Sequence, residues 1–264
     1  MIEPITDPDD PRIEPYRAVR ERDLVGREGR FVAEGEVVLR VLLTRSRFAV
    51  ESVLLAEVQL ERLGDLLPLV PTGVPVYSAS RAVMDEIVGF PIHRGILAIG
   101  RRGPAPSPAD LLAGLPETAL VVGLVGLANH DNVGGIFRNA AAFGAHAVLL
   151  DRESCDPLYR KAIRVSVGGA LIVPFARAES PDALCDALEA AGFGIVALSP
   201  SGREPLSQVR RASRTALLLG AEGPGLPDRI LARCRTASIP MAGGFDSLNV
   251  ATTSGIALHH LAGA

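Results

Sequence analysis

Short apolar runs alternate with amphipathic stretches along most of this chain, a pattern typical of α/β proteins. In the first hundred residues the pattern predicts four strands and four helices. The predicted helix over 36–45 has one apolar face, which is formed by Val37, Val38, Val41 and Leu42. The predicted strands cover residues 31–34, 52–56, 74–77 and 95–100, and the predicted helices cover 14–22, 36–45, 57–67 and 80–88. Together these elements predict a small α/β sandwich.

The same rhythm continues with stronger signals after residue 110. The run 119–127 is apolar almost throughout, as in a strand covered on both faces of a parallel sheet. Ser180, Pro181 and Asp182 predict the start of a helix, and Gly192 predicts its end. Further strands are predicted at 147–150, 194–198, 216–219 and 237–240, and further helices at 135–143 and 247–261. We expect a mainly parallel sheet with ligand-binding loops at the carboxyl ends of its strands.

The clearest interruption of the pattern is the segment Gly103-Pro-Ala-Pro-Ser-Pro108. Three prolines in six residues cannot continue a helix or a central strand. We therefore predict one domain over residues 1–103, a linker over 104–110 and a second domain over 111–264.

Composition and charge narrow the classes of protein. With 264 residues, 48% of them hydrophobic, the chain can bury a sizeable core, which excludes disorder of the whole chain. Its net charge of −3 argues against a generally basic nucleic-acid binder, so any RNA contact must use local clusters. Lys161 is the only lysine, so 26 of the 27 basic residues are arginines, which grip phosphates in bidentate fashion.

Cysteine usage and hydropathy bear on the compartment. Three widely spaced cysteines, Cys155, Cys185 and Cys234, form neither a disulfide framework nor a metal-ligand pattern, so we expect a reducing compartment and no metal. The acidic first ten residues hold no apolar signal stretch, and the longest apolar run, 119–128, is half of what a bilayer needs. We expect a cytoplasmic protein without a membrane partner.

Three loops that follow predicted strands carry the candidate chemistry. The first, over 129–135, contains Asn132, which we predict to cap the next helix, and Arg138 lies one turn into that helix, off its apolar face. The second, over 220–226, holds three glycines around one carboxylate, Glu222. The third, over 240–249, leads into the last helix. The dinucleotide and P-loop fingerprints are absent.

These loops resemble the three signature motifs of the SpoU/TrmH family of RNA ribose 2′-O-methyltransferases. The matching stretches are Asn132-Val-Gly-Gly-Ile-Phe-Arg-Asn-Ala-Ala-Ala-Phe-Gly144, Leu219-Gly-Ala-Glu-Gly-Pro-Gly225 and Ile239-Pro-Met-Ala-Gly-Gly-Phe-Asp-Ser-Leu-Asn-Val250. The resemblance implies S-adenosylmethionine as the cofactor, a deep trefoil knot in the C-terminal α/β domain, and a homodimer. It also implies methyl transfer to a ribose 2′-hydroxyl in structured RNA, rRNA rather than tRNA because of the appended domain.

The resemblance also implies roles for single residues. Arg138 is the expected catalytic residue, with Asn132, Glu222, Ser247 and Asn249 around it. The adenosine is expected on backbone groups near Gly220, Ile239 and Leu248, and the neighbouring residues Leu219, Gly225 and Met241 complete the expected cofactor site. One departure is visible: the family commonly has serine where this chain has Ala251.

Methyl transfer from a sulfonium has a good neutral leaving group, so the protein must align the methyl with the ribose hydroxyl and help to deprotonate that hydroxyl. Neutralising a free guanidinium at pH 7 costs about 8 kcal/mol, which disfavours an arginine as the base. We therefore expect Arg138 to position the substrate and stabilise charge, while Glu222 or a water molecule takes the proton.

Candidate RNA contacts are arginine clusters. Residues 156–168 resemble the family's segment between its first two motifs, and the predicted N-terminal domain resembles a ribosomal-protein-like RNA-binding domain. The expected RNA-binding residues are Arg160, Lys161, Arg164, Arg20 and Arg30. Two alternatives stay open: a catalytically silent RNA-binding relative of the same fold, and a dinucleotide-dependent metabolic enzyme, which the missing fingerprint disfavours. Beyond the preference for rRNA, the sequence does not specify the modified nucleotide, its position or the biological role.

Overall fold

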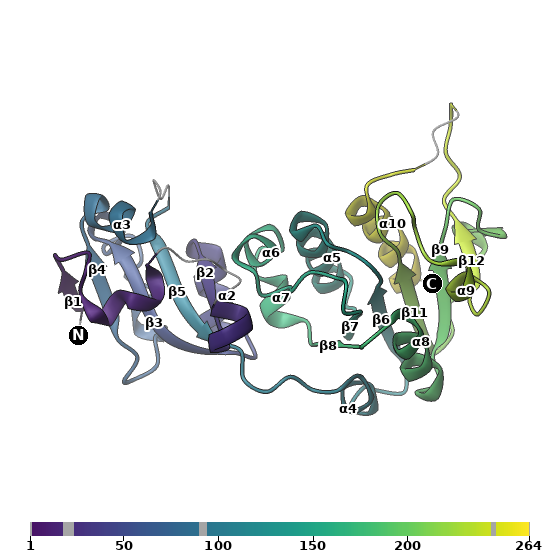
Figure 1. Cartoon of the computed structure of the whole chain (residues 1–264), viewed down its shortest axis with the longest axis horizontal. Helices are drawn as coiled ribbons and strands as arrows, with labels where there is room; N and C mark the ends of the chain where they lie inside the picture. Colours follow the sequence, from purple (N-terminus) through teal and green to yellow (C-terminus); the bar gives the residue numbers. More distant parts are fainter. Residues whose placement is uncertain (1, 18–23, 90–93, 244–246, 264) are drawn as a thin grey trace. The chain divides into compact units, whose positions relative to one another are not determined.

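The computed structural model describes residues 2–17, 24–89, 94–243 and 247–263, and the chain divides into two compact units (Figure 1). The first unit comprises Met1–Pro104 with Leu158–Ile172, and the second comprises Ala105–Pro157 with Val173–Ala264. Each unit has its own sheet and its own core.

The first unit is built on a five-stranded mixed sheet with the strand order β1-β4-β3-β5-β2. The first three strands in this order are parallel, whereas β5 runs antiparallel to both of its neighbours. The strands are β1 (Ile2–Ile5), β2 (Arg30–Glu34), β3 (Ala49–Ala56), β4 (Val76–Ala79) and β5 (Ile96–Arg101). Four of these strands match the predicted ones, while β1 lies in a stretch that the sequence pattern left unassigned.

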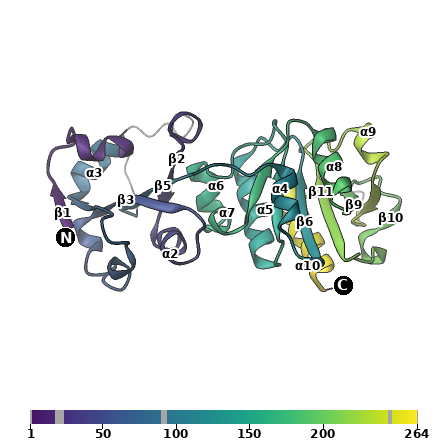
Figure 2. The same cartoon turned by 90° about the horizontal axis from the view of Figure 1, so that it is seen from below.

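Helices cover both faces of this sheet, as predicted for a sandwich: α2 (Glu36–Thr44) lies on one face and α3 (Arg81–Val88) on the other (Figure 2). On the α3 side, Met84 and Ile87 join a core with Leu54, together with Tyr16 from the 3₁₀ helix Pro11–Tyr16. The Tyr16 hydroxyl is buried and forms a hydrogen bond of 2.7 Å with Ser52 Oγ, so its burial leaves no unpaired polar group.

Two short helices from the middle of the chain also belong to the first unit. These are α6 (Arg160–Val165) and α7 (Gly169–Ile172). The amide of Arg47 donates to the carbonyl oxygen of Leu171, and Gly168 packs so closely on Val41 that a Cβ at position 168 would lie 2.9 Å from Cγ1 of Val41. The sequence pattern placed this segment in the domain after the linker, and the domain boundaries stay a prediction.

Several local predictions in the first unit are wrong. No α-helix covers 57–67; the structure has 3₁₀ turns at Glu57–Gln59 and Leu67–Leu69, because Gly64 and Pro68 interrupt the stretch. The expected helix over 14–22 is a 3₁₀ helix as far as Tyr16, and most of the rest lies outside the described residues. In α2, Val37 is 56% exposed, and the buried face is formed by Val38, Leu39 and Leu42.

The second unit is built on a seven-stranded sheet with the order β10-β12-β9-β11-β6-β7-β8, in which every pair of neighbours is parallel. This confirms the mainly parallel sheet expected from the apolar strands. The strands are β6 (Ala119–Leu124), β7 (Ala147–Leu150), β8 (Phe175–Arg177), β9 (Gly194–Leu198), β10 (Glu204–Pro205), β11 (Arg214–Leu219) and β12 (Arg235–Ser238). The short strands β8 and β10 were not predicted.

Helices cover both faces of the second sheet. One face packs on α8 (Pro181–Ala190) and on the short helices α4 (Pro108–Ala113) and α9 (Asp228–Leu231), through Leu112, Leu184, Leu188 and Ile230. The hydroxyl of Ser180 accepts a hydrogen bond from the amide of Ala183, which confirms the predicted N-cap. The other face carries α5 (His130–Ala142) and α10 (Val250–Gly263), which lie side by side (Figure 1).

Two helix boundaries in the second unit differ from the prediction. The helix α5 begins at His130, five residues earlier than expected, and its cap is Asn129, whose side chain accepts from the amide of Asp131. Asn132, the predicted cap, therefore lies inside the first turn. The last helix begins at Val250 and not at Ser247, because the side chain of Asn249 accepts from the amides of Ala251 and Thr252.

Candidate active site

A cavity of about 360 Å³ lies in the second unit where β9, β11 and β12 end. Its walls come from the segments that follow these strands and from the start of α10. The lining residues include Leu198, Ser199, Leu219, Gly220, Glu222, Gly225, Ile239, Met241, Ser247, Leu248, Asn249 and Thr253. All six predicted cofactor residues are among them, so the second and third predicted loops meet in one place.

The loop 220–226 is closed on itself by its backbone. The amide of Gly225 donates to the carbonyl oxygen of Ala221, and Gly223 and Gly225 both have positive φ. At Gly220 there is no room for a side chain, because a Cβ there would lie 2.5 Å from the carbonyl carbon of Gly225 and from the amide nitrogen of Leu226. Glycine at position 220 is therefore required for this loop shape.

Asn249 ties three parts of the site together. Its amide nitrogen donates to Oδ1 of Asn132 at 2.8 Å and to Oε1 of Glu222 at 3.2 Å, while its own Oδ1 caps α10. Residues far apart in the sequence are thereby joined in one hydrogen-bonded chain. Three of the five predicted catalytic residues belong to this chain, and Ser247 lines the same cavity.

Asn132 is the buried member of this chain, with 4% of its surface exposed. Its Oδ1 accepts from Asn249, but its Nδ2 has no hydrogen-bond partner among the described residues. An unpaired buried donor is unfavourable, since the loss of its hydration is not compensated. This nitrogen is therefore suited to an acceptor on a bound molecule.

The helices α5 and α10 approach each other closely behind the site. A Cβ on Gly135 would lie 2.7 Å from Cβ of Ala251, so both positions must hold small residues. Asn139 Nδ2 donates to the carbonyl oxygen of Ala251 and to Oγ of Ser254, which fixes the two helices against each other. Position 251, where the chain departs from the SpoU/TrmH pattern, thus packs against α5 and is not part of the cavity wall.

Arg138 lies two turns into α5 with its side chain exposed to solvent. No hydrogen bond or ion pair holds its guanidinium within the part of the chain that the structure describes. The buried residues of the same helix, among them Ile136, Phe137 and Ala140, lie on other sides of it, as the sequence analysis expected. The guanidinium of Arg138 is therefore free to bind a substrate.

The predicted RNA-binding residues have different surroundings. Arg160 and Arg164 form ion pairs with Glu34, and Arg30 is held by Glu28 and Glu51. Arg20 lies outside the described residues. Lys161 lies next to Arg160 on α6.

A buried network next to the site was missed by the sequence analysis. Asp151 follows β7, is 1% exposed, and accepts hydrogen bonds from the amide of Gly126 and from the amide and hydroxyl of Ser154. Arg177 donates to the carbonyl oxygens of Asp151 and Ser154. These bonds order the segment that leads from β6 into α5. The available signal was a carboxylate directly after a buried strand with a serine three residues later.

The cavity suits an adenosyl group. Leu219, Ile239 and Leu248 give it apolar walls, and its volume lies within the range of small-molecule sites, about 300–1,000 Å³. Gly220 lets the loop 220–226 close tightly on itself at the cavity wall, and Glu222 and Asn249 add polar groups to the lining. Among the described residues, no three His, Cys, Asp or Glu side chains gather as metal ligands, and no helix is long and apolar enough to span a bilayer.

A parallel α/β sheet with a nucleoside-sized cavity at its carboxyl edge and a polar chain at the cavity rim is typical of enzymes that bind a cofactor containing a nucleoside. The SpoU rRNA Methylase family model matches residues 119–259. The chain belongs to this family and is an RNA methyltransferase that uses S-adenosylmethionine. The resemblance found in the sequence is thereby confirmed.

Individual relatives agree with this assignment. The chain is 40% identical to an uncharacterized tRNA/rRNA methyltransferase of Mycobacterium tuberculosis, over 98% of this chain and 91% of the relative. It is 33% identical to the 23S rRNA (guanosine-2′-O-)-methyltransferase RlmB of Escherichia coli, over 73% of this chain and 82% of the relative. Among solved structures, the AdoMet-bound rRNA methyltransferase from Sinorhizobium meliloti has a TM-score of 0.81 at 25% identity and covers 98% of this chain and 97% of its own.

Proposed function

We propose that this protein transfers the methyl group of S-adenosylmethionine to a ribose 2′-hydroxyl of structured RNA, with rRNA as the substrate class. The observation that supports this most directly is the hydrogen-bonded chain Asn132–Asn249–Glu222 at the cofactor cavity. The named activity of the relative RlmB, methylation of a guanosine 2′-oxygen in 23S rRNA, supports the choice of acceptor atom and RNA.

Backbone groups of Gly220, Ile239 and Leu248 hold the adenosyl part of the cofactor, and Leu219, Gly225 and Met241 enclose it. All six residues line the cavity, which supports this assignment. When bound, the cofactor supplies an activated methyl on a sulfonium with a neutral leaving group. The chain itself must therefore bring the ribose oxygen into line and remove its proton.

Arg138 binds a phosphate next to the target ribose and stabilises the negative charge that develops on the 2′-oxygen. Its exposure and its lack of a partner among the described residues support this role. Asn132 Nδ2 donates to an oxygen of the substrate. The carboxylate of Glu222, held by Asn249, or a water molecule beside it takes the proton of the 2′-hydroxyl. Ser247, at the cavity wall, completes the set.

Methyl transfer from labelled S-adenosylmethionine tests the proposal. In vitro transcripts of bacterial 23S rRNA, 16S rRNA and a tRNA pool are offered in parallel, and the modified nucleotide is mapped by its resistance to alkaline cleavage. We expect incorporation into 23S rRNA at a nucleotide whose 3′ phosphodiester resists alkali. A label on a base would contradict the proposal. Tight RNA binding without any incorporation would favour the catalytically silent relative.

The substitution Arg138→Lys tests the role of the guanidinium, since it keeps the charge and removes the bidentate fork. We expect turnover to fall by about 100-fold, the range found when a positioned oxyanion donor is lost. The affinity for S-adenosylmethionine should stay unchanged. The control Arg152→Lys changes an exposed arginine that contacts the exposed Glu179 at 3.8 Å, and it should leave turnover unchanged. Near-normal turnover of Arg138→Lys would contradict the assignment.

Four further properties belong to the proposal. A trefoil knot in the second unit, a homodimer and RNA binding by the N-terminal sandwich come from the family resemblance. Cytoplasmic location, expected from the cysteine usage, is where rRNA and tRNA are found. Light scattering coupled to size-exclusion chromatography tests the dimer. A monomer at micromolar concentration would contradict it.

A further inference from the structure

Glu34, the last residue of β2, is buried in an unusual way. Only 6% of the residue is exposed, and no hydrogen bond within the described part of the chain reaches its Oε2 atom. Its neighbours are two guanidinium groups of α6: Nη1 of Arg160 at 3.4 Å and Nη1 of Arg164 at 3.6 Å from this oxygen. The carboxylate therefore neutralises these arginines electrostatically without forming the short bonds that Arg–carboxylate pairs prefer.

Glu51, in the same unit, shows what a fitted pair of this kind looks like. It also lies between two arginines, but Nε of Arg101 donates to it at 2.6 Å and Nη2 of Arg30 lies 2.8 Å from it. Burial on its own would raise the pKa of Glu51, but the hydrogen bonds from Arg101 and Arg30 hold it below its ordinary value. Glu34 thus contacts its two arginines at longer distances than Glu51 does.

A third guanidinium lies beside Gly35, the residue that follows Glu34. Arg94 is exposed, and its side chain lies along Gly35: a Cβ on Gly35 would be 2.8 Å from Nη1 of Arg94. Glycine at position 35 leaves the space that this arginine occupies. Three guanidinium groups therefore lie near the end of β2, and Glu34 supplies one negative charge to two of them.

We propose that Arg94, Arg160 and Arg164 form a surface that binds a backbone phosphate of the RNA substrate. Glu34 is the internal counter-ion of Arg160 and Arg164, and the phosphate replaces it as their partner when RNA binds. A phosphate offers several exposed oxygens in the geometry that guanidinium forks prefer, whereas the buried carboxylate offers only a long contact. In the absence of RNA, Glu34 keeps two like charges close together on one short helix. The inference rests on the proposed function only in taking RNA as the partner.

The substitution Glu34→Gln tests the proposal, with Glu51→Gln as the matched control. Each removes one negative charge beside two arginines of the first unit. Binding of an in vitro transcript of bacterial 23S rRNA is measured by filter retention, without cofactor, at several KCl concentrations. We expect Glu34→Gln to tighten binding about fivefold and to steepen the salt dependence by about one phosphate contact, and Glu51→Gln to change the affinity less than about twofold.

A double-mutant cycle shows whether Glu34 acts through the α6 arginines. In the Arg160→Gln/Arg164→Gln background, which should bind RNA more weakly, we expect Glu34→Gln to have no further effect. Equal effects of Glu34→Gln in both backgrounds, weaker binding by Glu34→Gln, or equal behaviour of the Glu34 and Glu51 variants would overturn the proposal.

A second variant keeps the test decisive should Glu34→Gln fail to fold. Arg94→Gln changes an exposed residue, and we expect it to weaken RNA binding about threefold, while Arg101→Gln, whose guanidinium Glu51 already neutralises, should change it less. Equal losses for both would overturn the proposal. Methyl transfer is assayed separately. If the variants bind RNA as expected but the wild type transfers no methyl group, only the proposed function is contradicted. If the wild type transfers methyl groups but the expected changes in RNA binding are not found, only this inference is contradicted.

Discussion

The cofactor cavity of the second unit and the arginine surface of the first unit are built on opposite principles. The cavity is shaped by backbone, glycines and apolar side chains, and its few polar groups form hydrogen bonds at 2.8–3.2 Å. In the arginine surface, Arg160 and Arg164 contact one carboxylate, Glu34, at 3.4–3.6 Å, which is longer than a hydrogen bond of a fitted ion pair. The first design suits one small molecule of fixed shape, and the second suits a flexible polyanion. Changes of shape should therefore damage the cavity, and changes of charge should affect the first unit.

The largest effect is expected from Gly220→Ala. A Cβ at this position would lie 2.5 Å from the backbone of Gly225 and Leu226, so the loop that forms the cavity wall would have to move. We expect the affinity for S-adenosylmethionine, measured by calorimetric titration, to fall at least about 100-fold, a loss of about 2.7 kcal/mol. RNA binding should change little, because the first unit is untouched.

Gly194→Ala is the matched control for that change. Its Cβ would meet only the carbonyl oxygen of Arg214 at 3.8 Å, which is ordinary contact, and Gly194 lies at the opposite end of β9 from the cavity. Cofactor affinity should remain at the wild-type value. An unchanged affinity of Gly220→Ala for S-adenosylmethionine would mean that the loop adapts to the added Cβ. The cavity would then not be rigid, and it would not differ in this respect from the charged surface of the first unit.

A smaller effect, which separates two roles of one residue, is expected at Asn249. Asn249→Ala removes both the cap of α10 and the bridge to Asn132 and Glu222, so we expect a loss of about 1 kcal/mol in unfolding free energy together with a roughly tenfold loss of turnover. Asn249→Asp keeps an oxygen for the cap and loses the donor for the bridge.

Urea unfolding and turnover, measured on both Asn249 variants, distinguish these roles. Asn249→Asp should unfold at a midpoint closer to the wild type than Asn249→Ala does, while its turnover falls at least as far. Wild-type turnover in Asn249→Asp would show that the hydrogen-bonded chain is only structural, and Glu222 would then lose its proposed role as the proton acceptor.

The sequence predicted the position of the cavity better than it predicted the ion-pair partners of the arginines. Glycines after buried strands are local signals, so the loops at Gly220 and Leu248 could be placed at one sheet edge from the strand pattern alone, while their chemistry came from the family motifs. The early start of α5 was missed because Asn129 and Asn132 are equally good caps by type, and only the burial of Asn132 in the fold decides between them.

Charge pairs were harder to predict because they join residues far apart in the chain. Nothing near Arg160 in the sequence indicates that α6 belongs to the first unit or that Glu34 is its counter-ion. The helix predicted over 57–67 is absent although Leu63 and Leu66 are buried, because both residues lie in turns between the 3₁₀ segments Glu57–Gln59 and Leu67–Leu69. Long-range partners decide such cases, and local patterns carry no information on them.

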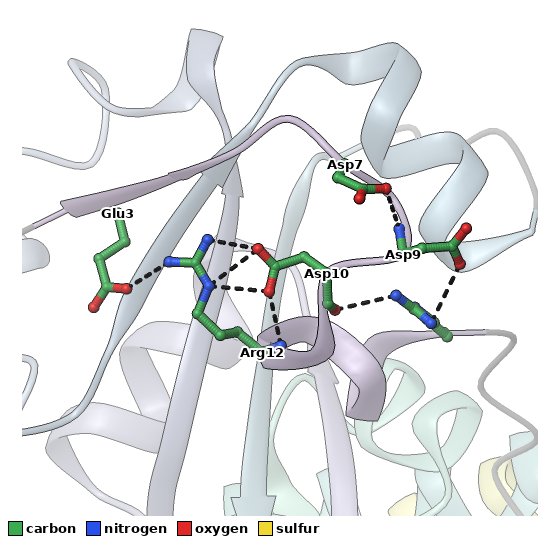
Figure 3. Close-up of polar contacts among 6 residues, drawn as sticks. Glu3, Asp7, Asp9, Asp10 and Arg12 are labelled. Atoms are coloured by element: carbon green, nitrogen blue, oxygen red, sulfur yellow. Dashed lines mark hydrogen bonds and ion pairs between the residues drawn. The ribbon is translucent and has the colours of Figure 1, made fainter.

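The smallest expected effect concerns charge alone and lies at the start of the first unit. Arg12 donates to both oxygens of Asp10, and its side chain also pairs with Glu3 (Figure 3). The side-chain and backbone hydrogen bonds from Arg12 lower the pKa of Asp10 from 3.8 to about 2. Because the pKa is lower in the folded state, the stabilisation is present above pH 4 and is lost as the pH falls towards 2.

Asp10→Asn should remove this pH dependence and keep the cap of the 3₁₀ helix, since an amide oxygen can still accept from the Arg12 backbone. We expect its urea midpoint to lie below that of the wild type at pH 5 and the difference to shrink between pH 4 and pH 2. Asp9→Asn is the control: Asp9 is 85% exposed and contacts Arg17 at 3.3 Å, so its difference from the wild type should be small at every pH. A difference in urea midpoint between Asp10→Asn and the wild type that stays constant from pH 5 to pH 2 would mean that the stability of the first unit does not depend on this charge. The dependence of the first unit on charge would then rest on the α6 arginines alone.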